Sequence, residues 1–386
     1  MLLANPFVEP QPIIFTQPDK QQMAIFKPIM RSASSIRFLC CALLLILFAS
    51  VHAQPPSPWT WQSVHEEDTS VRLDFPRFMH DSLPMLTDKM NLLLQQELLN
   101  AWLSPQSPSP FAALRWLPGI KGGLYELSYQ VWQQPHTLFL RLRYTARDDY
   151  GQSYGGSWHR MLDHQLARPL QFAEVFDTAR FRAFIPKLQN HFAQQIDLQA
   201  QARQLAGTRL QWLKDEVFYH LEQSLSCAWY VQNGHLFFIG DEQLSRQSQS
   251  LGLSVAFRLP LVESAYLFTD YGKYLFLDSP KAATPPAQYV LPYISGQVDS
   301  IGRFALLWTG QTDEGYIGKL MYLPGMYTAD IRARRQGQTL LVEVLPNPEG
   351  KPVAFLFLQP QGQQWTVRWL GAANVPEKKG TAICSY

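Results

Sequence analysis

The C-terminal third of the chain alternates short strand-like segments with glycine-containing turns, and no other feature restricts the fold as much. The segments are Ile317–Leu323, Tyr327–Arg334, Thr339–Leu345, Val353–Leu358 and Trp365–Leu370, and the turns between them include Pro324-Gly325 and Gln336-Gly337. Regularly spaced short strands with tight turns are typical of antiparallel barrels and sandwiches. We therefore predict a small all-β antiparallel barrel or sandwich over 287–371 and a loose tail over 372–386.

The preceding region, 60–280, contains both strand and helix patterns. Val71–Phe75 alternates apolar and polar residues, as do parts of Leu124–Trp132 and Thr137–Arg147. Such alternation predicts strands with one buried face, and the short connection between the last two predicts a hairpin. An antiparallel sheet is therefore expected here.

Helices are predicted at three places in the same region. Apolar residues recur every four positions over Pro84–Leu103, which indicates one buried helix face. A second helix is predicted over Phe181–Ile196, with Asp177 as its cap, and a third over Gln211–Ser224. The fold class is therefore α+β, an antiparallel-sheet domain with packed helices, and the Pro-rich segment Ser279–Pro286 is a linker to the β domain.

An export signal is predicted over Met30–Ala53. Arg31 and Arg37 supply the charged start, Phe38–Phe48 the apolar core, and small residues precede Gln54. This order of charged, apolar and small residues is typical of a cleaved secretory signal peptide. We therefore expect a secreted or periplasmic protein.

A transmembrane anchor and a buried core helix are the alternatives for this segment. Its uninterrupted apolar run is shorter than the ~20 residues that span a bilayer. Cys40 and Cys41 lie at the start of the run, whereas a lipid-anchored cysteine follows its end. We expect no stable membrane anchor after cleavage. Residues 1–29 are expected to be a non-translated or disordered leader, with translation starting at Met30.

Cleavage after residue 53 changes the charge and the cysteine content. The removed part holds four of the 33 Lys/Arg and two of the 31 Asp/Glu residues, so the mature chain has a net charge of zero. No basic cluster indicates nucleic-acid binding. Two cysteines remain, Cys227 and Cys384. In an oxidising compartment they can form one disulfide, and the sequence leaves this pairing open.

Several motifs between residues 70 and 275 resemble a known family. Tyr154-Gly155-Gly156-Ser157-Trp158-His159 follows two paired strands, and the segment Arg168–Phe176 follows in turn. This arrangement resembles the extracytoplasmic C-terminal domain of RsiV-type anti-sigma factors and of related secreted peptidoglycan deacetylases. The chain departs from that pattern at Trp158, where a small residue is usual, and before Arg168, where glycine is usual. The resemblance implies an extracytoplasmic binding or sensing module; in the RsiV branch the domain recognises lysozyme.

The loop before and within this motif is the candidate binding surface. It combines glycine, charge and aromatic residues, as recognition loops often do, although a solvated turn has the same composition. The residues expected to bind a ligand are Asp148, Asp149, Tyr150, Tyr154, Trp158 and His159.

Catalytic and metal motifs are weak in this sequence. Gly155 to His159 lacks the second glycine of a nucleophile elbow, so a turn is expected there instead. His159 and His164 are five residues apart and would point to opposite faces of a strand. We therefore predict no catalytic residue, no metal site and no cofactor.

These observations favour an exported cell-envelope recognition protein without catalytic activity. Its partner would be an extracytoplasmic protein, such as a lysozyme, or a cell-wall glycan. An envelope hydrolase acting on glycan or peptidoglycan through unrecognised carboxylates is the alternative. A structural assembly component is the third, if the β domain has unpaired strand edges.

Overall fold

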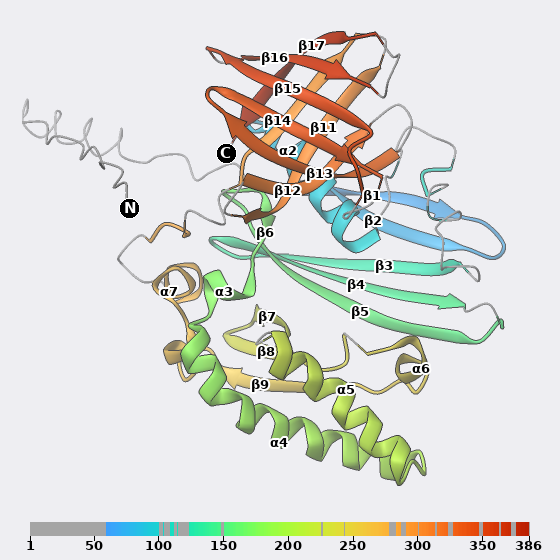
Figure 1. Ribbon diagram of the computed structural model, residues 1–386. Helices are drawn as coiled ribbons and strands as arrows, with labels where there is room; N and C mark the ends of the chain where they lie inside the picture. The colour runs from blue at the N-terminus through green and yellow to red at the C-terminus, as the bar shows by residue number, and fades with distance from the viewer. Residues whose placement is uncertain are drawn as a thin grey trace, which may run out of the picture. The chain divides into compact units, whose positions relative to one another are not determined.

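The computed structural model describes residues 59–385 except for the short segments 100–102, 104–108, 112–113, 115–122, 148–149, 225–226, 243, 278–282, 287–290, 300, 313–314, 323–326, 347–349, 363 and 372–375. Residues from Ser57 onward form one compact unit. It contains a six-stranded sheet, a three-stranded sheet and a closed barrel, with helices packed against both sheets (Figure 1). The predicted α+β class and the antiparallel barrel are confirmed. The predicted leader and signal peptide lie outside the described residues.

The six-stranded sheet follows chain order, and all its neighbouring strands are antiparallel except β2 and β3. The strands are β1 (Thr60–Glu67), β2 (Arg72–Met79), β3 (Leu124–Gln133), β4 (Thr137–Arg147), β5 (Ser153–Asp163) and β6 (Arg168–Pro169). Successive side chains of a strand point to opposite faces. Leu138, Leu140 and Leu142 of β4 therefore enter one core, and Phe139 enters another.

The predicted helix at 84–103 covers the leucine face of β4. It consists of α2 (Pro84–Leu94) and a π-helical turn, η1 (Gln95–Leu99). Pro84 suits the first turn, because that turn has no partner for a backbone N–H. Asn91 of α2 accepts a hydrogen bond from the Phe78 amide and donates one to the Phe78 carbonyl, both at 2.8 Å. These bonds attach α2 to β2.

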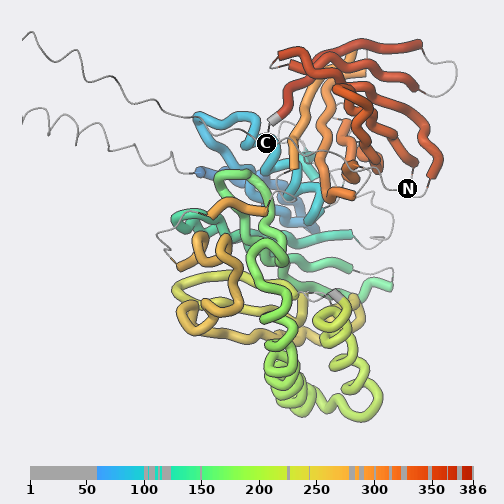
Figure 2. The backbone as a smooth tube through the Cα atoms, turned by 60° about the vertical axis from the view of Figure 1, so that its left-hand side comes forward, coloured from blue at the N-terminus to red at the C-terminus, as the bar shows by residue number. Residues whose placement is uncertain are grey.

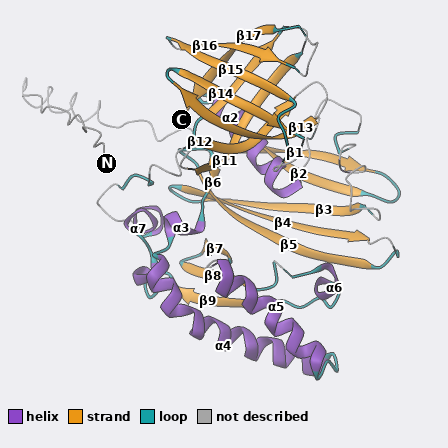
Figure 3. Ribbon diagram, in the orientation of Figure 1, coloured by secondary structure: helices purple, strands orange, loops and turns teal. Residues whose placement is uncertain are grey.

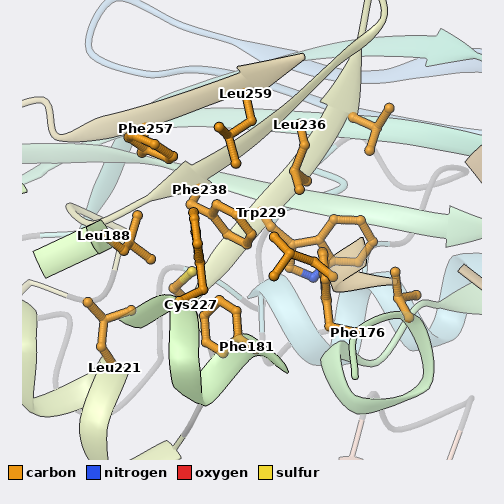
Figure 4. Packing of buried hydrophobic residues seen from close by; sticks show 14 of the residues in the cluster. Phe176, Phe181, Leu188, Leu221, Cys227, Trp229, Leu236, Phe238, Phe257 and Leu259 are labelled. Carbon is orange, nitrogen blue, oxygen red and sulfur yellow. The ribbon is translucent and has the colours of Figure 1, made fainter. Parts of the chain in front are cut away.

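A second sheet covers the opposite face of the six-stranded sheet. It consists of β7 (Ala228–Gln232), β8 (His235–Ile239) and β9 (Ala256–Pro260). Two long helices, α4 (Thr178–Ala202) and α5 (Thr208–Ser224), cover its other side (Figure 3). Figure 4 shows the side chains of α4, α5 and this sheet meeting in one apolar cluster, which includes Phe181, Leu188 and Phe238.

The helix predictions in this region are confirmed, with longer boundaries. Asp177 caps α4 as expected, because its carboxylate accepts a hydrogen bond from the Arg180 amide at 3.0 Å. No helix in the described part of the chain is long and apolar enough to span a membrane. The remaining short helices are α3 (Phe172–Val175), α6 (Arg246–Gln249), η3 (Ala265–Leu267) and α7 (Asp270–Phe276).

The C-terminal region is a barrel in which each strand pairs with the next and β17 pairs with β10 (Figure 2). Apolar side chains such as Leu306, Val342 and Leu356 fill its interior, as expected for a barrel of this size. The strands are β10 (Tyr293–Val298), β11 (Gly302–Thr312), β12 (Gly315–Tyr322), β13 (Tyr327–Gln336), β14 (Thr339–Leu345), β15 (Ala354–Gln361), β16 (Gln364–Leu370) and β17 (Lys378–Ser385).

The expected tail over 372–386 is wrong, since β17 lies within it. The segment Lys378–Ser385 contains two lysines and few large apolar residues, so its sequence does not resemble a buried strand. The barrel edges provided by β10 and β16 supply backbone partners on both sides. Closure of the barrel, rather than apolar patterning, makes this segment a strand.

The disulfide that the sequence left open is not formed, because Cys227 and Cys384 are both free. Cys227 is buried in the cluster between α4, α5 and the three-stranded sheet. Cys384 belongs to β17, opposite Ile294 of β10. The two thiols therefore lie in different cores.

The pairing of β10 with β17 can be tested at Gly296. A Cβ atom at this position would lie 2.4 Å from the Thr381 carbonyl oxygen and 2.7 Å from the Ala382 Cβ. We expect Gly296→Ala to lower the free energy of unfolding by about 1–3 kcal/mol, as overpacking does. Urea denaturation measures this, with Gln297→Ala, at an exposed position of the same strand, as the control expected within about 0.5 kcal/mol of the parent. Equal stabilities for the two variants would contradict the pairing.

Candidate functional site

The predicted binding residues differ in burial where the structure describes them. Asp148 and Asp149 lie outside the described residues, and Tyr150 is 95% exposed. Tyr154 is buried, and the Trp158 ring stacks on Tyr144 with 4.3 Å between ring centroids. The Tyr154 ring is therefore largely removed from solvent, Trp158 is half-buried, and the joint binding surface stays a prediction.

The expected turn at Gly155-Gly156 is also wrong, since both glycines lie within strand β5 and neither has a positive φ. They are needed for a close approach instead. A Cβ at Gly155 would lie 2.6 Å from the Tyr144 carbonyl oxygen, and one at Gly156 would lie 3.1 Å from the Tyr144 hydroxyl. That hydroxyl donates a hydrogen bond to Gln249 of α6 at 2.9 Å. The glycines therefore let Tyr144 connect the sheet to α6.

A polar cleft lies between the six-stranded sheet and the segment that joins β8 to β9. Its volume is about 580 Å³, within the range of small-molecule sites. The sheet contributes residues of β3, β4 and β5, and the joining segment contributes Asp241 and residues around Ser254. His159 also lines this cleft, so one of the predicted site residues belongs to it.

Two arginines of β4, Arg141 and Arg143, form part of the cleft wall. They are two residues apart on one strand and therefore share a face. Arg141 pairs in register with His159 of β5, and Arg143 with Ser157. Opposite residues on neighbouring strands lie on the same face. All four residues therefore face the cleft.

Neither arginine has an ion-pair or hydrogen-bond partner for its side chain among the described residues, and the Arg141 Nε atom is fully buried without a bond. Burial and the nearby positive charge of Arg143 lower the pKa of Arg141. The two like charges repel each other, and the partly buried one also loses hydration, whereas the nearby charge of Asp241 opposes the shift. The cleft therefore presents two guanidinium groups that form no direct ion pair among the described residues.

His159 is held by a network at the base of the cleft. Its Nδ1 atom lies 2.9 Å from a carboxylate oxygen of Glu242, which also accepts a hydrogen bond from the His159 amide. Arg160 donates to Glu242 at 2.6 Å and to Glu97 at 2.5 Å. The His159 ring also stacks with Tyr230 at 5.1 Å. Since all these groups are mutually satisfied, His159 has a structural role in positioning the cleft wall.

Asp241 is the acidic residue of the joining segment in the cleft. Burial raises the pKa of its carboxyl group, although the Val255 amide donates a hydrogen bond to it at 2.9 Å and opposes this shift. Burial likewise raises the pKa of the Tyr144 and Tyr230 hydroxyls. Burial therefore favours the uncharged form of each of these three groups.

Catalytic and metal chemistry finds no support in the part of the molecule that the structure describes. No group of three or more His, Cys, Asp or Glu residues could hold a metal ion there. Ser157 lies in the middle of β5 rather than at a strand-to-helix turn. The nucleophile elbow considered from the sequence is thus not present at this serine.

Sequence reasoning missed Arg141 and Arg143. The signal was available in Thr137–Arg147, where leucines alternate with Phe139, Arg141 and Arg143. A strand with apolar residues on one face and arginines on the other indicates one core face and one polar face. The sequence does not show that a second sheet covers the polar face, and this covering makes the cleft.

No family profile and no curated protein matches this sequence. A crystal structure of a DUF3298 family member from Bacteroides fragilis is similar to it, with a TM-score of 0.34 and 11% sequence identity. The similarity covers 57% of this chain and 98% of that one. A likeness this distant carries no functional assignment.

The charge of Asp241 can be tested by pH-dependent stability. A carboxyl pKa raised in the folded state means that folding favours the protonated carboxyl group. The contribution of this group to the free energy of unfolding is therefore present at low pH and is lost as pH rises through the folded pKa. Asp241→Asn, which keeps the acceptor for the Val255 amide, is expected to raise the melting temperature at pH 7. It should have no such effect below the ordinary carboxyl pKa of 3.8. Thermal denaturation at both pH values measures this.

The exposed Asp299 provides the matched control, since Asp299→Asn should leave the melting temperature unchanged at both pH values. A destabilised Asp241→Asn protein at neutral pH would show that the carboxylate is favourable in the folded state.

Proposed function

We propose that this protein is an exported, non-catalytic recognition protein whose polar cleft binds a carboxylate-bearing cell-wall glycan. The pair Arg141 and Arg143, unpartnered in the described structure, carries the proposal. Guanidinium groups bind carboxylates through two parallel hydrogen bonds, so an acidic sugar would supply the missing partner.

The rest of the cleft lining fits a hydroxyl-rich ligand. Ser128, Thr145, Ser157 and Gln249 line it with the arginines. Such side chains donate and accept hydrogen bonds without charge. The acidic groups of the lining are Asp241 and Glu126, and the Glu126 carboxylate accepts a hydrogen bond from the Thr145 hydroxyl at 3.0 Å. A polar cleft with few apolar surfaces favours a sugar over an apolar ligand.

The sequence features support the same location and class of function. The predicted signal peptide over Met30–Ala53 would bring the protein to the compartment where wall glycans occur. The resemblance to RsiV-type extracytoplasmic domains favours recognition over catalysis. The network at His159 supports this too, because Glu242 is engaged with His159 and Arg160 rather than directed to a substrate.

Calorimetric titration of the full chain tests the proposal. The probe is the muramyl disaccharide, which carries a lactyl carboxylate, and the neutral comparison is chitobiose, which lacks it. We expect binding of the muramyl disaccharide alone. Arg141→Ala and Arg143→Ala should each weaken it by about tenfold to a hundredfold, the effect of losing a charged hydrogen bond worth about 1.5–3 kcal/mol.

Arg182→Ala is the matched control, because Arg182 is exposed on α4. It should bind like the parent protein, and circular dichroism should show all variants folded. Equal binding of chitobiose would contradict a carboxylate site. Hydrolysis of the disaccharide would support the envelope hydrolase instead, and binding of a secreted lysozyme that survives both arginine substitutions would support a protein partner.

A further inference from the structure

A second cavity lies where α2 faces the barrel. Leu92 of α2 packs with Tyr293, Leu307 and Met321 of the barrel in one small apolar cluster. The cavity beside this cluster has a volume of about 520 Å³ and is lined by α2, the β6 segment and strands β10 to β12. It shares no lining residue with the polar cleft.

Lys89 of α2 lines this cavity and is only 5% exposed. No hydrogen bond or ion pair of its ammonium is found among the residues that the structure describes, and the ammonium nitrogen is not one of the fully buried atoms that lack a bond, so it borders the cavity. Lysines are almost never buried without a partner, because removing an ammonium group from water is costly. A buried, unpartnered lysine on a cavity wall therefore requires an explanation.

Every other charged residue on the cavity wall has a partner of opposite charge. Arg168 binds Glu174 through two hydrogen bonds of 2.6 and 2.7 Å. The Lys319 ammonium lies 2.6 Å from Asp330, and Glu97 lies 2.5 Å from Arg160. Of these wall residues, Lys89 alone has no ion pair within 4.0 Å among the described residues.

The charged neighbours of Lys89 outside the cavity wall do not supply the missing partner. Asp163 lies within electrostatic reach and its negative charge favours the ammonium, but it forms no ion pair with Lys89, and its carboxylate oxygens accept hydrogen bonds from the Tyr271 hydroxyl and from the amides of Gln165 and Leu166. The Cys384 thiol is also near, and burial raises its pKa, so it remains a neutral group. Arg168 has the same sign of charge as Lys89.

The remaining wall of the cavity is mostly apolar. Leu93 of α2 faces Leu291, Pro292 and Leu307 of the barrel region across it. A cavity whose wall is mostly apolar and in which one cation, Lys89, has no ion pair among the described residues is complementary to a ligand with one anionic group and an apolar body.

We propose that this cavity binds a small amphipathic carboxylate, whose head group pairs with the Lys89 ammonium and whose apolar body packs against Leu93, Leu291 and Leu307. The carboxylate would replace the water that the ammonium loses on burial. Binding would also remove the apolar body and the three side chains from water, which favours association.

The electrostatics of Lys89 agree with this geometry. Burial, and secondarily the charge of Arg168, lower the pKa of Lys89 to about 8. The folded protein therefore disfavours the charged lysine relative to the unfolded chain, where the pKa is the ordinary 10.5. This destabilisation is present at neutral pH and is lost as the pH rises to 10.5. An anionic ligand would offset this destabilisation.

The test uses decanoate as the ligand, decan-1-ol as the uncharged comparison, and titration of the full chain at pH 7 followed by tryptophan fluorescence. We expect decanoate to bind at least tenfold more tightly than decan-1-ol. Lys89→Met, which keeps the length of the side chain, should weaken decanoate binding at least tenfold and leave decan-1-ol binding unchanged. Lys351→Met, at an exposed position, should bind like the parent.

A second measurement does not depend on the ligand. Removing a buried charge that has no ion pair should raise the melting temperature of the ligand-free Lys89→Met protein at pH 7 above that of the parent. Equal affinity of the parent for decanoate and decan-1-ol, or decanoate binding unaffected by Lys89→Met, would overturn the proposal. A lower melting temperature for Lys89→Met would overturn its premise that the ammonium is unpartnered. None of these outcomes bears on Arg141 and Arg143, so this site and the glycan site fail or succeed separately.

Discussion

The two faces of strand β4 organise the whole α+β region. Leu138, Leu140 and Leu142 enter the core beneath α2, whereas Phe139 enters the core shared with the three-stranded sheet. A strand buried on both faces cannot shift by one residue, because every side chain would then move to the wrong core. The register of β4 against β3 and β5 is thereby determined, and with it the positions of the layers on either side (Figure 1).

The polar cleft follows from the same alternation. Phe139 stacks on Tyr230 of β7 with 4.5 Å between ring centroids, and this contact holds the second sheet against the first. Further along the same face the strand carries Arg141 and Arg143 in place of apolar residues. Close packing cannot continue across two charged side chains, so the layers enclose a cleft there. One strand thus supplies both the contact that joins the sheets and the charges that the cleft presents.

At the β5 side of the six-stranded sheet, ion pairs take the place of a further long strand. β5 pairs with β6 only at Leu162 and Asp163. Along the rest of β5, Arg160 joins Glu97 of η1 to Glu242 after β8. Such a network covers an exposed strand edge and connects three layers, which protects the edge from pairing with another chain. It also determines the position of His159, and hence one wall of the cleft.

Local patterns were sufficient for much of this fold. The α+β class, the cap at Asp177 and the strands from β12 to β16 follow from periodicity and turn residues, since these features depend on neighbours in sequence. Strand β17 could not be predicted in this way, because its partners β10 and β16 are brought together only when the barrel closes. The candidate site shows the same division between local and distant information. The sequence analysis named His159 as a site residue but did not name Arg141 or Arg143.

The amino-acid sequence by itself determined the α+β class and most of the strands of the barrel, because periodicity and glycine turns are local properties. Only the tertiary structure decided which polar residues share a cleft and which charge lacks a partner. Lys89 is unremarkable in the pattern of α2, and its burial depends on a barrel that begins some two hundred residues later in the chain. Partners distant in sequence determine burial and charge compensation, and these two quantities distinguish a candidate binding residue from an ordinary surface charge.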